Sequence, residues 1–204
     1  MLATKHPVGS RSRFRHKQAG ITAVEVALLA PIFFALVFAA IEVARLMFVF
    51  NTLQEVTRRA ATAAVNVNPN DATAVSDLKL NAIFRTTSGA LTLSPEVTDS
   101  NIRIDYMSLS RGADGSLTML PMPESSWPAG PAQNRRNCMA NPNGADCIRF
   151  VRVQVCDNAS TSACSAIRST VSFILGNFSI DLPKATTIAP AESLGYLPGM
   201  SPGS

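Results

Sequence analysis

Histidine is nearly missing from this 204-residue chain, because the two histidines present, His6 and His16, both lie in its first 16 residues. The rest of the chain therefore has no histidine base for a nucleophilic triad and no histidine ligand for a zinc ion. A phosphate-binding loop and a dinucleotide-binding glycine pattern are also missing from the sequence. These absences predict a protein that is not an enzyme and that uses no cofactor.

Acidic residues are missing from the first 24 positions, which hold the basic residues Lys5, Arg11, Arg13, Arg15 and Lys17. Five of the 18 basic residues and none of the 14 acidic residues lie in residues 1–20, so this leader accounts for the whole net charge of +4. The remaining chain is close to neutral. Its charge therefore gives no reason to expect a nucleic-acid partner.

A long apolar run follows the basic leader. The 16 residues from Val26 to Ile41 carry no charge, and Glu25 and Glu42 stand at either end. A helix of this length covers about 24 Å, so apolar neighbours must extend it to residues 21–50 to cross a hydrocarbon core of about 30 Å. Pro31 removes one backbone hydrogen bond, which membrane helices tolerate. The basic leader predicts a cytoplasmic N-terminus and a C-terminal domain across the membrane.

A cleaved secretory signal peptide is the alternative interpretation of this segment, with Val37-Phe38-Ala39 as its small-residue cleavage site. Two features speak against it. The apolar run continues beyond Ala39 in helical register, and a signal peptide has no use for Glu25 or Pro31. We therefore favour a membrane helix.

The helical pattern continues beyond the apolar run. Apolar residues recur at spacings of three and four from Leu46 to Val67, and Asn66-Val67-Asn68-Pro69 predicts the end of the helix. Ala60, Ala61, Ala63 and Ala64 make this part narrow enough to pack either under a sheet or against another subunit. The predicted division is a leader (1–20), a transmembrane helix (21–50), a helix extension (51–67) and a periplasmic α+β domain (68–204).

The last segment contains signals for both helix and sheet. Asp71 predicts the start of a second helix, which Ser88-Gly89 would end. Alternating apolar residues predict an antiparallel sheet with these strands: Ile102–Leu109, Ser116–Leu120, 148–155 and 184–190. Residues 121–147 read as a long loop, and residues 170–178 fit a short helix or a strand equally well. The C-terminal residues 195–204 are expected to fray.

The four cysteines, Cys138, Cys147, Cys156 and Cys164, lie close together in the predicted exported domain. An even number of cysteines in such a domain favours disulfides. We favour Cys138 with Cys147 and Cys156 with Cys164, because each pair brackets a turn-rich loop. A zinc site formed by all four thiolates is the alternative, but the chain has no Cys-x-x-Cys pair and the spacings do not suit such a site.

The residues from Gly20 to Ala64 resemble the TadE-like family of tight-adherence pilus assembly proteins. The resemblance is carried by Ala23-Val24-Glu25, by Pro31, by the Glu42 to Arg45 pair that ends the apolar run, and by the Ala- and Arg-rich segment from Leu53 to Ala64. Gly20, followed by four residues and Glu25, also resembles the processing site of type IV prepilins. The residue after Gly20 is Ile and not Phe, and Glu25 is followed by Val, which departs from the prepilin pattern.

This resemblance implies that a prepilin peptidase cuts between Gly20 and Ile21 and leaves an α-ammonium group at Ile21. Glu25 then lies one helical turn away. A carboxylate inside a bilayer costs about 3 kcal/mol on insertion scales, so we expect Glu25 to pair with the N-terminus of a neighbouring subunit. The simpler alternative is a glutamate that sits among lipid headgroups. Glu42 and Arg45 are expected to form an ordinary ion pair, with a role in recruitment as the alternative.

The sequence thus predicts a single-pass protein of the bacterial inner membrane that helps to build a tight-adherence pilus. Its expected partners are the membrane, other pilus-assembly subunits and a prepilin peptidase. Two alternatives stay open. One is a membrane-anchored periplasmic binding or adhesion module unrelated to pili, and the other is a secreted enzyme released by signal peptidase.

Overall fold

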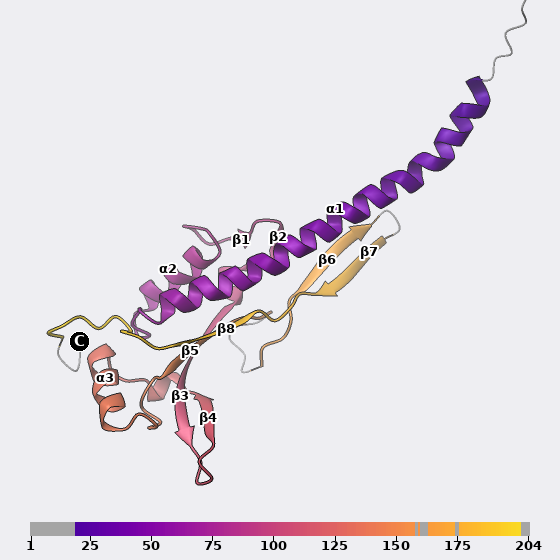
Figure 1. The fold of residues 1–204 in the computed structure, drawn as a ribbon. Coiled ribbons are helices and arrows are strands. Elements are labelled where there is room, and N and C mark those ends of the chain that lie inside the picture. The colour runs from indigo at the N-terminus through magenta and orange to yellow at the C-terminus, as the bar shows by residue number, and fades with distance from the viewer. Residues whose placement is uncertain (1–18, 158, 160–162, 174–175, 201–204) are drawn as a thin grey trace, which may run out of the picture. The chain divides into compact units, whose positions relative to one another are not determined.

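The computed structural model describes residues 19–157, 159, 163–173 and 176–200. The chain divides into two compact units, Met1–Ala40 and Ile41–Ser204. Helix α1 (Ala19–Ala64) contributes to both units (Figure 1). We call the second unit the head. The basic leader lies outside the described residues except for its last two positions.

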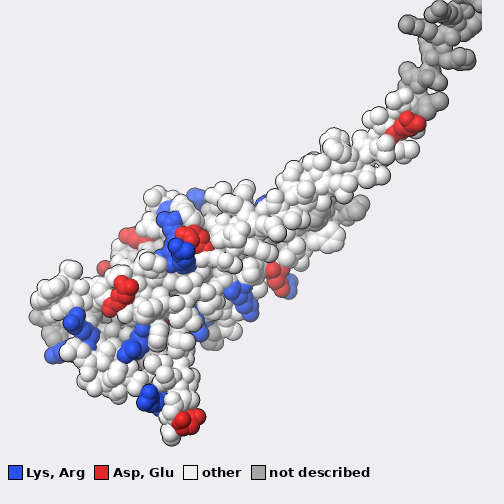
Figure 2. Space-filling view, viewed as in Figure 1, with Lys and Arg blue, Asp and Glu red and all other residues white. Residues whose placement is uncertain are grey.

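Helix α1 is built mainly from alanine, leucine, valine and phenylalanine, and it runs through Pro31 without a break. Its large side chains between Val24 and Ile41 are exposed on every side. The helix is long and apolar enough to cross a membrane by length and composition. Figure 2 shows few charged side chains on the part of α1 that precedes the head, whereas charges of both signs cover the head.

In its described residues, the head joins the C-terminal part of α1 to two further helices and three antiparallel sheets, which confirms the expected α+β class (Figure 1). Strands β4, β3, β5 and β8 form the main sheet in that order, while β1 pairs with β2 and β6 pairs with β7. The remaining elements are α2 (Ala72–Ala82), β1 (Ala90–Leu91), β2 (Ser94–Thr98), β3 (Ile102–Arg111), β4 (Leu117–Pro121), α3 (Pro131–Ala140), β5 (Phe150–Val155), β6 (Arg168–Phe173), β7 (Gly176–Asp181), β8 (Thr186–Pro190) and the short 3-10 turns Asp99–Asn101 and Glu124–Ser126.

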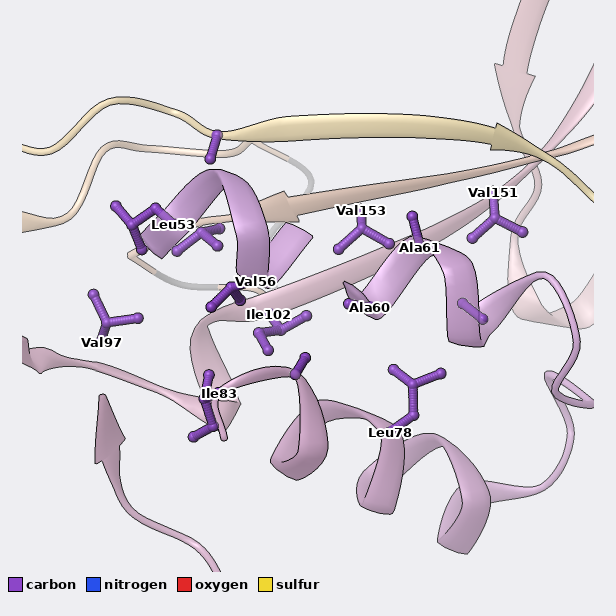
Figure 3. Close-up of a cluster of buried hydrophobic side chains, with 14 of the residues drawn as sticks. Leu53, Val56, Ala60, Ala61, Leu78, Ile83, Val97, Ile102, Val151 and Val153 are labelled. Atoms are coloured by element: carbon purple, nitrogen blue, oxygen red, sulfur yellow. The ribbon is translucent and has the colours of Figure 1, made fainter. Parts of the chain in front are cut away.

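The hydrophobic core lies between α1, α2 and one face of the main sheet, as Figure 3 shows. Residues 151, 153 and 155 of β5 are buried on alternate positions and pair in register with residues 106, 104 and 102 of β3. Their partners on α1 include Leu53, Val56, Ala60 and Ala61. The narrow alanine segment thus packs inside the head, because only small side chains let the helix approach the sheet this closely.

Helix α1 ends at Ala64, three residues earlier than the sequence predicted, and α2 begins at Ala72 with Asp71 as its cap. The Asp71 carboxylate accepts a hydrogen bond from the backbone N–H of Ala74, at 3.0 Å. Helix α2 ends at Ala82, well before Ser88-Gly89, because Phe84 adopts a left-handed backbone conformation (φ 62°) while Ile83 turns into the core. The cap was predicted correctly, and the end of α2 was wrong.

The segment 121–147 differs from expectation, whereas the segment 170–178 follows the strand alternative. Helix α3 lies within the predicted loop 121–147, and the ambiguous segment forms most of the β6–β7 hairpin. Helix α3 is polar, and the buried amide of its own Asn134 attaches it to the chain just before β5. This amide donates to the carbonyl of Ile148 and accepts from its N–H, as a neighbouring strand would. Such a helix leaves almost no apolar period in the sequence.

Both disulfides form with the pairing that the sequence favoured, Cys138–Cys147 and Cys156–Cys164. Their positions explain the pairing. Cys138 lies in α3, and Cys147 ends the turn that leads back towards β5. Cys156 directly follows β5, and the turn closed by Cys164 leads on to β6. Each bridge therefore closes a short local loop at one end of β5.

Replacing Cys138 and Cys147 together with alanine is expected to lower the free energy of unfolding by about 2.5 kcal/mol. A cross-link that closes a loop of nine residues removes about this much chain entropy from the unfolded state. Denaturant unfolding in a mild detergent, without reductant, measures the loss. Because the Cys156–Cys164 loop is almost as long, its double variant should lose a similar amount. A loss below about 0.5 kcal/mol for either pair would contradict the entropic account.

Candidate functional site

The residues singled out in the sequence fall into two separate groups along α1. Gly20 and Ile21 lie in the first turn of the helix. Glu25 and Pro31 are exposed on the apolar part of the helix, and Glu25 forms no ion pair with another described residue. A carboxylate in such a position is open to a partner from outside the chain.

Glu42 and Arg45 form the second group and lie where α1 enters the head. The Arg45 guanidinium is 2.9 Å from a carboxylate oxygen of Glu42, across one turn of the helix. It also donates to the carbonyl of Leu93, in the turn between β1 and β2, at 3.0 Å, and to the carbonyl of Thr170 in β6 at 3.2 Å. One side chain thus ties the helix to two hairpins that are far apart in the sequence.

Glu96 joins the same two hairpins from the side of β2. Its carboxylate accepts hydrogen bonds from the hydroxyl of Ser169 at 2.9 Å and from the N–H of Thr170 at 3.3 Å, both in β6. The hydroxyl of Ser94 donates to its other oxygen. We call the set Glu42, Arg45, Leu93, Glu96 and Thr170 the collar. It fixes both hairpins around the point where α1 enters the head.

The environment of Glu96 shifts its titration. Burial raises the pKa of this carboxyl, but hydrogen bonds from its own backbone N–H, from Ser169, from Thr170 and from Ser94 together outweigh burial and lower the pKa overall. A carboxyl with a lowered pKa stabilises the fold above its ordinary pKa of about 4.3. That contribution is lost as the pH falls through the lowered value.

We therefore expect Glu96→Gln to lower the free energy of unfolding at neutral pH by about 1 kcal/mol, the usual worth of a charge-assisted hydrogen bond. The difference from the unchanged protein should shrink as the pH falls below about 4, where the carboxylate takes up its proton. Thermal or denaturant unfolding between pH 3 and 7 measures both curves. Parallel curves for the two proteins over this range would contradict a stabilising charge at Glu96.

The head also has open surface clefts. The one beside α2, about 630 Å³ in volume, is lined by Lys79, Asp99, Glu124 and Trp127 among other residues. Burial lowers the pKa of Lys79, and the carboxylate of Asp99 offsets part of that shift. No group of three or more metal-ligating side chains lies together in the part of the chain that the structure describes. Among the described residues, the clefts therefore hold no such group of metal ligands.

The sequence indicated the Glu42–Arg45 pair, because residues three apart share one face of a helix. It gave no sign that Leu93, Glu96 and Thr170 belong to the same collar, because all three are far from Arg45 in the sequence. A weak signal exists at Glu96. It lies two residues from Ser94, so a strand over these residues would place both side chains on the same face, where the Ser94 hydroxyl can reach the carboxylate.

Comparison with known proteins gives one match. The model of the family described as TadE-like protein matches residues 20–62. The matched segment lies entirely within α1 and includes Glu25, Pro31, Glu42 and Arg45, so the resemblance seen in the sequence is confirmed over this helix. No curated protein and no solved structure matches the chain.

Proposed function

We propose, on the premise that residues 20–62 form a TadE-like helix, that this chain is a non-enzymatic subunit that helps to assemble a tight-adherence pilus. The observation that carries the proposal is the coincidence of the family match with an apolar helix whose side chains are exposed on every side. A helix that is apolar all round is stable either inside lipid or among other apolar helices. Both environments occur in a membrane-bound assembly machine.

In this proposal α1 crosses the bacterial inner membrane once, with the leader in the cytoplasm and the head in the periplasm. The basic leader supports this orientation, because positive charges stay on the cytoplasmic side. The two disulfides of the head support an oxidising compartment. The finer proposal is that the protein acts as a minor pseudopilin, whose helix packs against those of other pilus-assembly subunits.

Processing and pairing follow from the proposed role. A prepilin peptidase would cut after Gly20, and the α-ammonium of Ile21 would be the cation that a neighbouring Glu25 needs in the apolar layer. Glu25 is exposed on the helix and forms no ion pair with another described residue, which suits a partner from a second subunit. The carboxylate would otherwise stay uncompensated at a cost of about 3 kcal/mol.

The first experiment is the intact mass of the protein purified from its native membrane, with and without an active prepilin peptidase. A mass that starts at Ile21 and depends on the peptidase supports the proposed processing. A mass that starts at Met1 in both cases contradicts it and leaves an anchored protein without maturation. A start near Ala40 would favour the secreted alternative, which signal peptidase releases.

The second experiment tests assembly through Glu25. We expect Glu25→Gln to reduce co-purification of the protein with other pilus-assembly subunits. Glu124→Gln, which changes an exposed glutamate of the head in the same way, is the matched control and should have no effect. Equal co-purification of both variants would contradict pairing at Glu25. If even the unchanged protein fails to co-purify with pilus-assembly subunits, a binding module unrelated to pili becomes the better account.

A further inference from the structure

The exposed side of α1 stays apolar well beyond the charged pair that ends the apolar run in the sequence. Ile41, Val43, Met47 and Phe48 are all about half exposed or more, whereas the exposed side chains from Asn51 to the end of α1 are polar. Glu42 and Arg45 lie between them on the side that the head covers, and only about a fifth of each side chain is exposed. The polarity of the outer surface thus changes after Phe48 and not at Glu42.

The apolar side chains beyond Glu42 make up for the fact that the uncharged run of α1 is too short to cross a bilayer. The uncharged run from Val26 to Ile41 covers about 24 Å, less than the hydrocarbon core of about 30 Å. The seven residues that follow Ile41, up to Phe48, add about 10 Å on the exposed side. The missing thickness is therefore available if lipid covers the outer side of α1 as far as Phe48. The charges of Glu42 and Arg45 are meanwhile satisfied by each other and by the head.

The head presents apolar side chains at the same level. Leu93, whose carbonyl binds Arg45, is 53% exposed. Its backbone is in the left-handed region (φ 63°), where leucine costs about 1 to 2 kcal/mol and glycine or asparagine costs little. A strained residue that persists in a turn points to a role for its side chain. An exposed leucine gains nothing from water, so its role requires an apolar environment.

Strand β7 adds to this surface. Phe178 and Ile180 lie two residues apart, so they share one face of the strand, and both are exposed. Phe178 stands opposite Val171, the neighbour of the Thr170 whose carbonyl binds Arg45. The apolar side chains of both hairpins are therefore held near the level of Arg45 by the collar.

We propose that the head rests on the membrane surface, with Leu93, Phe178 and Ile180 in the boundary between lipid headgroups and acyl chains of the leaflet from which α1 emerges. This inference rests on the proposed function only in that α1 spans a bilayer. Lipid is the occupant because the collar holds this surface at the level of Arg45, among the exposed apolar side chains that α1 carries from Ile41 to Phe48. The collar then has a second effect, since it holds Arg45 against the head and away from lipid.

The test uses the full chain in two sets of phosphatidylcholine vesicles, one with bromine near the headgroup end of the acyl chains and one with bromine near the chain end. Leu93→Trp and Ile180→Trp are two independent reporters, and the signal of the native Trp127 is subtracted with the unchanged protein. Val37→Trp reports the span itself, and Leu117→Trp, at a similarly exposed leucine of β4, is the matched control. We expect the bromine near the headgroup end to quench the fluorescence at positions 93 and 180, and the bromine near the chain end to quench that at position 37. Neither set should change the fluorescence at position 117.

The possible failures are distinguishable. Quenching at position 37, with positions 93 and 180 no more quenched than position 117, overturns the docking of the head and leaves the anchor intact. Absence of quenching at position 37 overturns the span, and the docking with it. Protection from bromine at positions 93 and 180, with emission that changes with the protein-to-lipid ratio, assigns the surface to a second copy of the chain and also overturns the proposal.

Discussion

Replacing Leu53 with alanine is expected to destabilise the head by about 3 to 4 kcal/mol, although this residue belongs to the same helix as the predicted membrane span. Leu53 is fully buried, and it packs against the core formed by α1, α2 and the main sheet (Figure 3). Removing a buried leucine loses its transfer free energy and leaves a cavity that the surrounding side chains only partly fill. A loss of this size is a large fraction of the roughly 5 to 15 kcal/mol by which a domain is typically stable.

Denaturant unfolding of the protein in a mild detergent, followed by circular dichroism, measures this loss. Leu117→Ala is the matched control, because Leu117 is exposed on β4 and its truncation should change the free energy of unfolding by less than about 0.5 kcal/mol. If Leu53→Ala costs no more than the control, the second half of α1 does not belong to the core of the head. It would then be a linker.

The packing of the second half of α1 could be predicted, because a long amphipathic helix repeats its apolar residues at regular spacings. Leu53, Val56, Ala60 and Ala64 recur at spacings of three and four, and all four are buried in the head. Strands β3, β4 and β5 were predictable for the same reason, since alternation marks one buried face of a sheet. The disulfide pairing followed from two short loops rich in turn residues.

The elements that escaped prediction lack such periods. Helix α3 is held by the amide of Asn134 and by the Cys138–Cys147 bridge, neither of which leaves a repeating apolar signal. Strand β7 is exposed along its whole length, so its side chains could not be sorted by burial. The β6–β7 hairpin exists because β6 packs in the head, and the sequence of β7 does not reveal this.

At the candidate site, too, only part of the collar could be predicted from the sequence. The pair Glu42 and Arg45 follows from helix geometry, but the carbonyls of Leu93 and Thr170 are backbone groups and carry no sequence signal. A contact between an arginine and a backbone carbonyl depends only on where the fold places that carbonyl. The apolar helix could be recognised in the sequence, whereas the hydrogen bonds from Arg45 to the two hairpins are seen only in the structure.

The second large loss of stability is expected from a substitution on the face of the main sheet that does not pack against α1 and α2. Asp105 of β3 stands opposite Arg152 of β5, and Arg103 lies two residues away on the same face. The Asp105 carboxylate is 2.7 Å from Arg103 and 2.8 Å from Arg152, one oxygen facing each guanidinium. Only 10% of the Asp105 side chain is exposed. Loss of this carboxylate would remove the negative charge that lies between two largely covered guanidinium groups.

Asp105→Asn is therefore expected to lower the free energy of unfolding by about 3 kcal/mol, because breaking a largely buried ionic group by removing one partner typically costs about 3 to 5 kcal/mol. Asp181→Asn is the matched control. Asp181 lies 3.5 Å from Arg168, and both side chains are mostly exposed, so its loss should cost less than about 1 kcal/mol. Unfolding in low and high salt separates the two cases, since salt screens exposed pairs far more than covered ones. Equal and salt-sensitive losses for both variants would mean that Asp105 makes only a surface ion pair.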